Sequence, residues 1–119
     1  MSNSKHFNKY LKIDGEDLDG SVTVSNGDNT DALRLSDWEN RHKSFYFVMD
    51  TLTSGDAEVT PQITDPDGNW HDYYQDLDYK ITEENKAFPL MFESEAEYLR
   101  FEFNLQDDTS LTAWICERR

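Results

Sequence analysis

Short segments in which apolar and polar residues alternate, separated by turn-forming residues, recur along this 119-residue chain. The clearest one lies near the end, where Leu99, Phe101, Phe103 and Leu105 alternate with polar or amphipathic neighbours. Because successive side chains of a strand point to opposite faces, this spacing predicts a strand with those four side chains in a core. No stretch of ten residues carries an amphipathic helical stripe, so the sequence predicts an all-β fold.

Seven further segments have the composition or the alternation of strands. They are residues 10–14, 21–25, 32–36, 44–51, 57–63, 69–74 and 111–116. Residues 44–51 are apolar on both faces, which is typical of a central strand. Pro61 cannot donate to a ladder and therefore marks an edge strand or a bulge. The intervening residues 75–97 are expected to form a long connection that contains one short strand.

Two turn sequences predict hairpins. Asn26-Gly-Asp-Asn29 should join residues 21–25 to residues 32–36, because Asn and Gly tolerate the positive φ of tight turns. Asp65-Pro-Asp-Gly68 has the residues of a type I turn and should pair 69–74 with 57–63. Seven to nine short strands at this spacing predict an antiparallel β-sandwich or jelly roll, with an up-and-down barrel as the alternative.

A single domain over residues 10–119 accounts for the whole pattern, and residues 1–9 read as a flexible polar arm that contains Phe7. Eleven Lys and Arg against 25 Asp and Glu give a net charge of −14, the wrong sign for binding nucleic acid or an anionic membrane directly. Cys116 is the only cysteine and is expected to pack in a strand. The N-terminal residues lack the apolar stretch of a signal peptide, so we expect synthesis in a cytoplasm.

The acidic turns were tested as catalytic and metal sites. If Gly68 is aligned on the glycine of a calcium loop, Ile63 and Tyr74 fall on ligand positions, so the EF-hand pattern fails. A shallower cation site of Asp65, Asp67 and Asp72 stays open as an alternative, although turns use Asp for local hydrogen bonds. Neighbouring acids elsewhere follow from composition. The sequence therefore predicts no enzyme activity, no required metal and no cofactor.

The most suggestive binding feature is a group of aromatic residues that follows the Asp65 turn. Trp70, His71, Tyr73 and Tyr74 lie close together in the chain, and Phe7 is a further candidate contact in the arm. Rings that alternate along a strand point to both faces, so some can enter the core while others meet a sugar or a protein. We expect these five residues to supply binding contacts.

Two segments carry a resemblance to a known class of proteins. "SFYFVMDTLTSGDAEVTPQITDPDGNW" at residues 44–70 and "YLRFEFNLQDDTSLTAWI" at residues 98–115 resemble small structural proteins of tailed bacteriophages. The resemblance implies a β-sandwich in the virion, as a capsid decoration, head-tail or tail protein that works by assembly with virion subunits or copies of itself. Similar hairpins and strands occur in carbohydrate-binding sandwiches, so a glycan-binding module is the alternative function.

Overall fold

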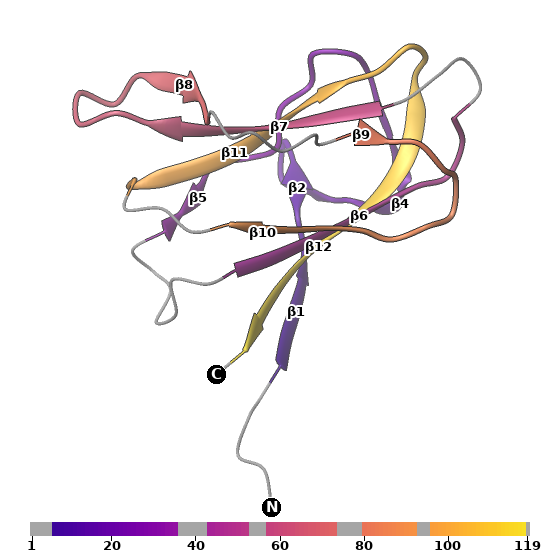
Figure 1. Cartoon of the computed structure of the whole chain (residues 1–119), viewed down its shortest axis with the longest axis horizontal. Helices are drawn as coiled ribbons and strands as arrows, with labels where there is room; N and C mark the ends of the chain where they lie inside the picture. The colour runs from indigo at the N-terminus through magenta and orange to yellow at the C-terminus, as the bar shows by residue number, and fades with distance from the viewer. Residues whose placement is uncertain (1–5, 36–42, 53–56, 74–79, 93–95, 119) are drawn as a thin grey trace, which may run out of the picture.

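The protein is a two-layered, antiparallel β structure (Figure 1), which confirms the predicted all-β sandwich. The structure, a computed structural model, describes residues 6–35, 43–52, 57–73, 80–92 and 96–118. Of the twelve strands in these residues, eight are three or more residues long. The strands are β1 (His6–Tyr10), β2 (Lys12–Ile13), β3 (Glu16–Asp17), β4 (Asp19–Val24), β5 (Leu33–Arg34), β6 (Lys43–Met49), β7 (Ala57–Thr64), β8 (Trp70–Asp72), β9 (Lys80–Ile81), β10 (Phe88–Phe92), β11 (Tyr98–Asn104) and β12 (Thr109–Arg118).

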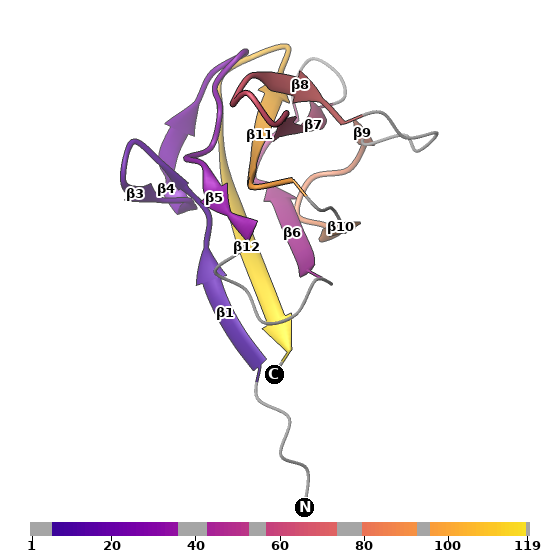
Figure 2. The same ribbon diagram turned by 90° about the vertical axis from the view of Figure 1, so that its left-hand side faces the viewer.

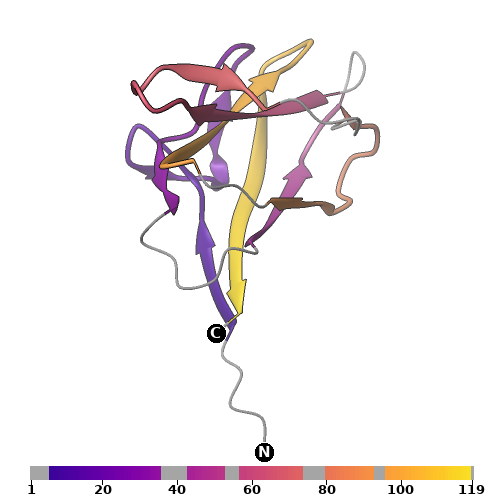
Figure 3. The same cartoon turned by 60° about the vertical axis from the view of Figure 1, so that its left-hand side comes forward.

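One layer, the β12 sheet, has the order β1-β12-β6-β10, and β4 also pairs with β12. β4 pairs with the first half of β12 and β1 with the second half, both along the edge opposite β6. β12 and β1 run side by side away from the rest of the molecule and end near each other (Figures 2 and 3). The ten-residue strand β12 thus pairs with three other strands of this layer.

The other layer, the β7 sheet, has the order β5-β11-β7-β8, and β9 also pairs with β7. The connection expected over residues 75–97 therefore contains two strands, β9 and β10, rather than one. The apolar residues Phe88–Phe92 form β10, which joins the β12 sheet at the edge of β6. Leu90 points into the core and is 3% exposed, so burial of its side chain contributes to holding this edge strand.

The inner faces of both sheets form one apolar core. Leu99, Phe101, Phe103 and Leu105 are buried, as their alternation predicted. Phe101 meets Phe45 of the opposite sheet edge-on, with ring centroids 4.8 Å apart. This cross-sheet contact between aromatic rings places Phe101 at the centre of the sandwich.

Pro61 lies in a strand with neighbours on both edges. Its partner Phe101 directs its N–H and carbonyl toward Thr30, away from β7. In antiparallel geometry the backbone nitrogen and carbonyl of Pro61 then also point away from β11, toward the opposite edge of β7. On that side β8 pairs with residues 62–64 and β9 with residues 57–58, and just beyond β8 the Pro61 carbonyl accepts a hydrogen bond from the Tyr73 N–H at 2.8 Å. The missing N–H of Pro61 therefore costs one reciprocal bond at the end of the β8 pairing, and Pro61 lies neither in an edge strand nor at a bulge of the β11 pairing.

The turn at residues 26–29 does not form the expected hairpin, and that prediction was wrong. β4 pairs with β12, whereas β5 pairs with β11 of the other sheet. The Gly27 N–H donates to the Phe103 carbonyl and the Thr30 N–H donates to the Phe101 carbonyl, each at 2.8–2.9 Å. The turn therefore carries the chain from the β12 sheet to the β7 sheet. Its own backbone groups form hydrogen bonds with the edge of β11 that does not pair with β7.

The polar lead-in expected over residues 1–9 is a paired strand in the part that the structure describes. His6–Tyr10 form β1, and Phe7 lies opposite Glu117. The physical reason is that the second half of β12 has an open edge, which backbone groups can satisfy whatever the side chains are. Residues 1–5 of the expected arm lie outside the described residues.

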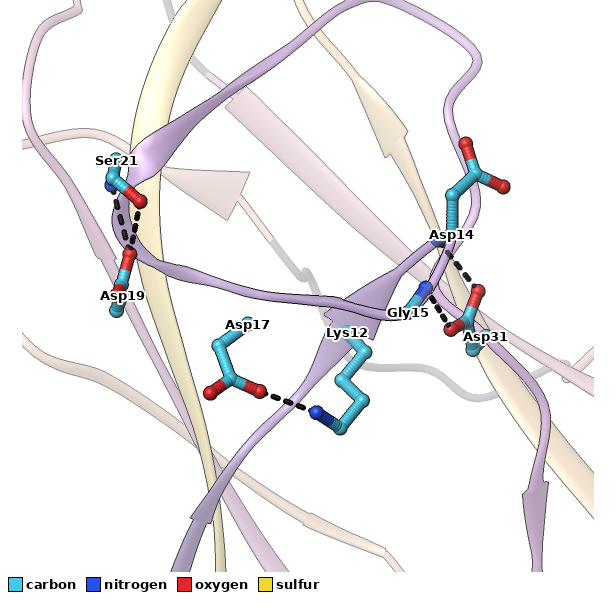
Figure 4. Close-up of polar contacts among 7 residues, drawn as sticks. All are labelled: Lys12, Asp14, Gly15, Asp17, Asp19, Ser21 and Asp31. Carbon is cyan, nitrogen blue, oxygen red and sulfur yellow. Dashed lines mark hydrogen bonds and ion pairs between the residues drawn. The ribbon is translucent and has the colours of Figure 1, made fainter.

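A hydrogen-bonded turn connects Asp14 and Gly15 to Asp31 (Figure 4). The Asp31 carboxylate accepts hydrogen bonds from the N–H groups of Asp14 and Gly15, each at 2.8 Å. Both residues have positive φ, 50° and 79°, which points their N–H groups at one acceptor. The Asp31 N–H also donates to the Lys12 carbonyl at 2.8 Å. These bonds join the β2–β3 hairpin to the segment that crosses between the sheets.

Candidate functional site

The structure separates the aromatic residues that the sequence grouped together. Trp70 and His71 belong to β8, and Tyr73 follows it. Tyr73 is partly buried and packs against the core. Phe7 belongs to β1 in the other sheet, and Tyr74 lies outside the described residues. Trp70 is thus the member of the predicted group that lies on the outer face of the β7 sheet, where its strand neighbours carry polar side chains.

Asp65 organises the turn before Trp70. Its Oδ1 accepts the N–H groups of Asp67 and Asn69 at 2.9 Å, and its Oδ2 lies 2.7 Å from Nε2 of His71. The Gly68 N–H closes the turn by donating to the Asp65 carbonyl at 2.9 Å, which confirms the predicted hairpin. The hydrogen bond from His71, followed by those from the backbone, lowers the pKa of Asp65 from 3.8 to about 2. The turn is therefore held by an ionised carboxylate.

An open groove of about 440 Å³ lies next to this turn, and we call it the Trp70 groove. Tyr98, Thr64 and Trp70 form a row across β11, β7 and β8 along its floor. Trp70 and Tyr98 are both half-buried. The groove is lined by Ala32, Thr64, Asp65, Pro66, Asp67, Gly68, Trp70, Glu97 and Tyr98.

A second row beside the floor is a connected set of polar side chains. Gln62, which is 9% exposed, accepts a hydrogen bond from Arg100 Nε at 2.7 Å and donates to Asp72 at 2.9 Å. The guanidinium carbon of Arg100 lies 4.3 Å from the ring centroid of Trp70. This cation–π contact and the bond to Gln62 fix the Trp70 ring and the Arg100 side chain together.

The outer face of the β12 sheet carries a different surface, which the sequence did not predict. Tyr10, Trp114, Tyr46 and Pro89 lie opposite one another across β1, β12, β6 and β10, and we call them the aromatic row. They point outward, because the residues alternating with them on β12 and β6 are buried in the core. Tyr10 and Trp114 stack with their centroids 6.1 Å apart.

The aromatic row is accessible at both ends. Tyr10 is 37% exposed, and Pro89 is also exposed. Met91, two residues beyond Pro89 on the same face of β10, is 69% exposed. A signal for this surface existed in the sequence, because Tyr46 and Trp114 alternate with core residues. The strand register that puts the four rings in one line was not readable from local patterns.

The described residues contain no group of three or more His, Cys, Asp or Glu side chains that could hold a metal ion, so Asp65, Asp67 and Asp72 are not gathered into one site. They contain no helix long and apolar enough to cross a membrane. Cys116 is half-buried, and burial raises the pKa of its thiol, which disfavours the reactive thiolate.

Comparison with known proteins leaves the two outer faces as the basis for any assignment. No protein-family model, curated protein or solved structure matches this chain.

Proposed function

We propose that this protein is a non-enzymatic structural subunit of a virion that docks onto another subunit through the aromatic row. The observation that carries this proposal is a line of three aromatic rings and Pro89 on the outer face of the β12 sheet, in which Tyr10 is exposed, with the exposed Met91 beside it. Aromatic residues and methionine are enriched at protein interfaces, and a few such anchors supply most of the binding free energy.

The surface is rigid enough to act as an anchor. Trp114 and Tyr46 belong to the two inner strands of the β12 sheet, each paired on both edges. Trp114 is also stacked on Tyr10. Side chains held in this way lose little conformational entropy when a partner binds, so more of the contact energy appears as affinity.

The charge of the chain indicates the kind of partner. Asp19 lies opposite Thr112, one outward position along β12 from Trp114, and Asp50 accepts a hydrogen bond from Ser110 at the next outward position. A second copy would bring the same acids to the interface and another net charge of −14 to the complex. We therefore assign a different protein as the partner, with a basic rim around an apolar centre.

The resemblance of residues 44–70 and 98–115 to structural proteins of tailed bacteriophages supports placing that partner in a virion. The two segments include all of β7 and β11 and most of β6 and β12, which form the middle of both sheets. A capsid decoration, a head-tail protein and a tail protein would all use such a docking face. In each case the protein would act through assembly and would be found in the virion after synthesis in the host cytoplasm.

The variant Met91→Glu tests the docking face. We expect the variant to fold with an unchanged melting temperature, because Met91 is 69% exposed. Its incorporation into particles should fall by about tenfold or more, because the new charge would be desolvated without a partner. The measurement is the amount of the protein in purified particles, assembled in cells that supply the variant in place of the wild type.

Gln106→Glu is the matched control, since it adds the same charge at an exposed residue in the loop between β11 and β12. We expect this control to be incorporated at the wild-type level. Wild-type incorporation of Met91→Glu would contradict the docking face. Particles that contain none of the wild-type protein would contradict the virion function altogether.

A further inference from the structure

The Trp70 groove lies on the opposite side of the sandwich from the aromatic row and combines apolar rings with a hydroxyl group. Tyr98 and Trp70 flank Thr64 in one cross-strand row. Both rings are half-buried and line the groove, so part of each ring meets the space within it. Aromatic surface beside hydrogen-bonding groups suits a ligand that has apolar and polar faces of its own.

The wall of the groove is preorganised. Asp65 holds the turn through two backbone N–H groups and His71, and the Gly68 N–H bonds to the Asp65 carbonyl. On the other flank, Gln62 connects Arg100 to Asp72. A ligand that enters the groove therefore does not have to order these groups, and the entropic cost of binding is reduced.

Most charged side chains around the groove contact a polar or charged partner. Asp65 contacts the His71 ring at 2.7 Å, Glu97 lies 3.7 Å from Arg34, and the Arg100–Gln62–Asp72 set joins a cation to an acid. Among the lining acids in the described part of the chain, Asp67 at the tip of the turn is the one without an ion-pair contact. An anionic ligand would be repelled by the three acids that line the groove, whereas hydroxyl groups could share these fixed donors and acceptors.

We infer that the Trp70 groove binds a neutral sugar in the pyranose form. The apolar C–H face of a pyranose can lie against Trp70 or Tyr98 while its hydroxyl groups reach Thr64 and the carboxylates. The volume of about 440 Å³ is at the lower end of the range for ligand pockets and fits a mono- or disaccharide. This site is independent of the docking proposed for the aromatic row, because it lies on the other sheet.

The test is a titration of the full-length, ¹⁵N-labelled protein with four neutral disaccharides, maltose, cellobiose, lactose and di-N-acetylchitobiose, followed by NMR. At least one sugar should give saturable shifts of the Trp70 indole N–H and the amides of Asp67, Gly68 and Tyr98. An open groove of this kind predicts a dissociation constant of about 1 mM. No saturable shift with any of the four sugars up to about 50 mM would overturn the inference.

Two variants localise the binding. Trp70→Ala should weaken it by about tenfold or more, because the stacking surface is lost. Ala32→Trp should block the groove while removing none of its polar groups, since Ala32 is an exposed residue of its wall. Ala32→Trp therefore still tests sugar binding in the groove if Trp70→Ala is unstable. Met91→Glu, on the other sheet, should bind the sugar as the wild type does.

Charged probes decide between ligand classes. Trilysine and glucuronic acid should cause no saturable shifts at the concentrations where a neutral sugar does. Binding of trilysine in place of the sugars would indicate a site for basic peptides. Binding of glucuronic acid alone would show that the Arg100 charge controls recognition. Either result would overturn the neutral-sugar assignment.

Discussion

The outer faces of the two sheets differ although their inner faces build a common core. On the β12 sheet, Tyr10, Trp114, Tyr46 and Pro89 form an uninterrupted line of rings. On the β7 sheet, the rings of the floor are separated by a hydroxyl, and a hydrogen-bonded polar row lies beside them. The inner faces are constrained by burial, which leaves the outward positions to determine what each sheet recognises.

The difference follows from which strands carry the rings. In the β12 sheet two of them, Tyr46 and Trp114, lie on inner strands, so apolar surface continues from strand to strand. In the β7 sheet one ring, Tyr98, lies on the inner strand β11, but the neighbouring outward positions of β11 and β7 carry Arg100, Gln62 and Thr64. The ring of Trp70 comes from the edge strand β8. A continuous apolar surface suits a protein partner, whereas rings interrupted by fixed polar groups suit a hydroxylated ligand.

The largest expected effect comes from breaking the core that both faces share. Phe101→Ala should lower the free energy of unfolding by about 3 to 5 kcal/mol, because Phe101 is fully buried against Phe45 and Phe47. Urea denaturation of the variant and the wild type measures this difference. If Phe101→Ala proved as stable as the wild type, the common core would not support both faces.

The next effect compares the two tryptophans. Trp114→Ala should cost about 2 kcal/mol, roughly half the value for a fully buried ring, since Trp114 is half-buried in an inner strand and stacked on Tyr10. Trp70→Ala should cost about 1 kcal/mol, because Trp70 lies on an edge strand and its ring is in contact with Arg100. Urea denaturation should give this order. The reverse order would show that the Trp70 groove, not the aromatic row, is the better-packed surface.

A smaller effect, confined to the β7 sheet, is expected in acid. The pKa of Asp65 is lowered from 3.8 to about 2, chiefly by His71. A lowered folded-state pKa stabilises the fold above the unfolded value, and that contribution is lost as the pH falls from about 4 through about 2. The ¹³C shift of the Asp65 carboxyl should therefore titrate near pH 2, and at a higher pH in His71→Ala, which keeps only the hydrogen bonds from the turn. A midpoint near 4 in the wild type would mean that the turn is not held as described.

The smallest effect is expected away from both faces. Lys12 and Asp17 form an ion pair at 2.6 Å in the β2–β3 hairpin, with both side chains nearly half exposed. Lys12→Met should change the free energy of unfolding by less than about 1 kcal/mol, because solvent screens such pairs. Docking and sugar binding should be unchanged, as measured by incorporation into particles and by the NMR titration. A loss of either one would show that the hairpin is coupled to that face.

The sequence by itself determined the local elements. The alternation through Leu99, Phe101, Phe103 and Leu105 was enough to predict a strand and its buried face, because side-chain direction repeats every two residues. The hairpin at Asp65 was also predictable, since its turn chemistry lies within a few residues. The half-buried Trp70 could be named as a candidate contact for the same reason.

Only the tertiary structure decided which strands meet. Residues 26–29 read as a hairpin but join two sheets, and residues 6–9 read as part of an arm but belong to β1, which completes an edge of β12. The aromatic row combines residues from four strands, and the Trp70 groove is lined by residues as far apart as Ala32 and Tyr98. Local patterns specify the face on which a side chain lies, whereas the register between distant strands depends on the packing of the whole core.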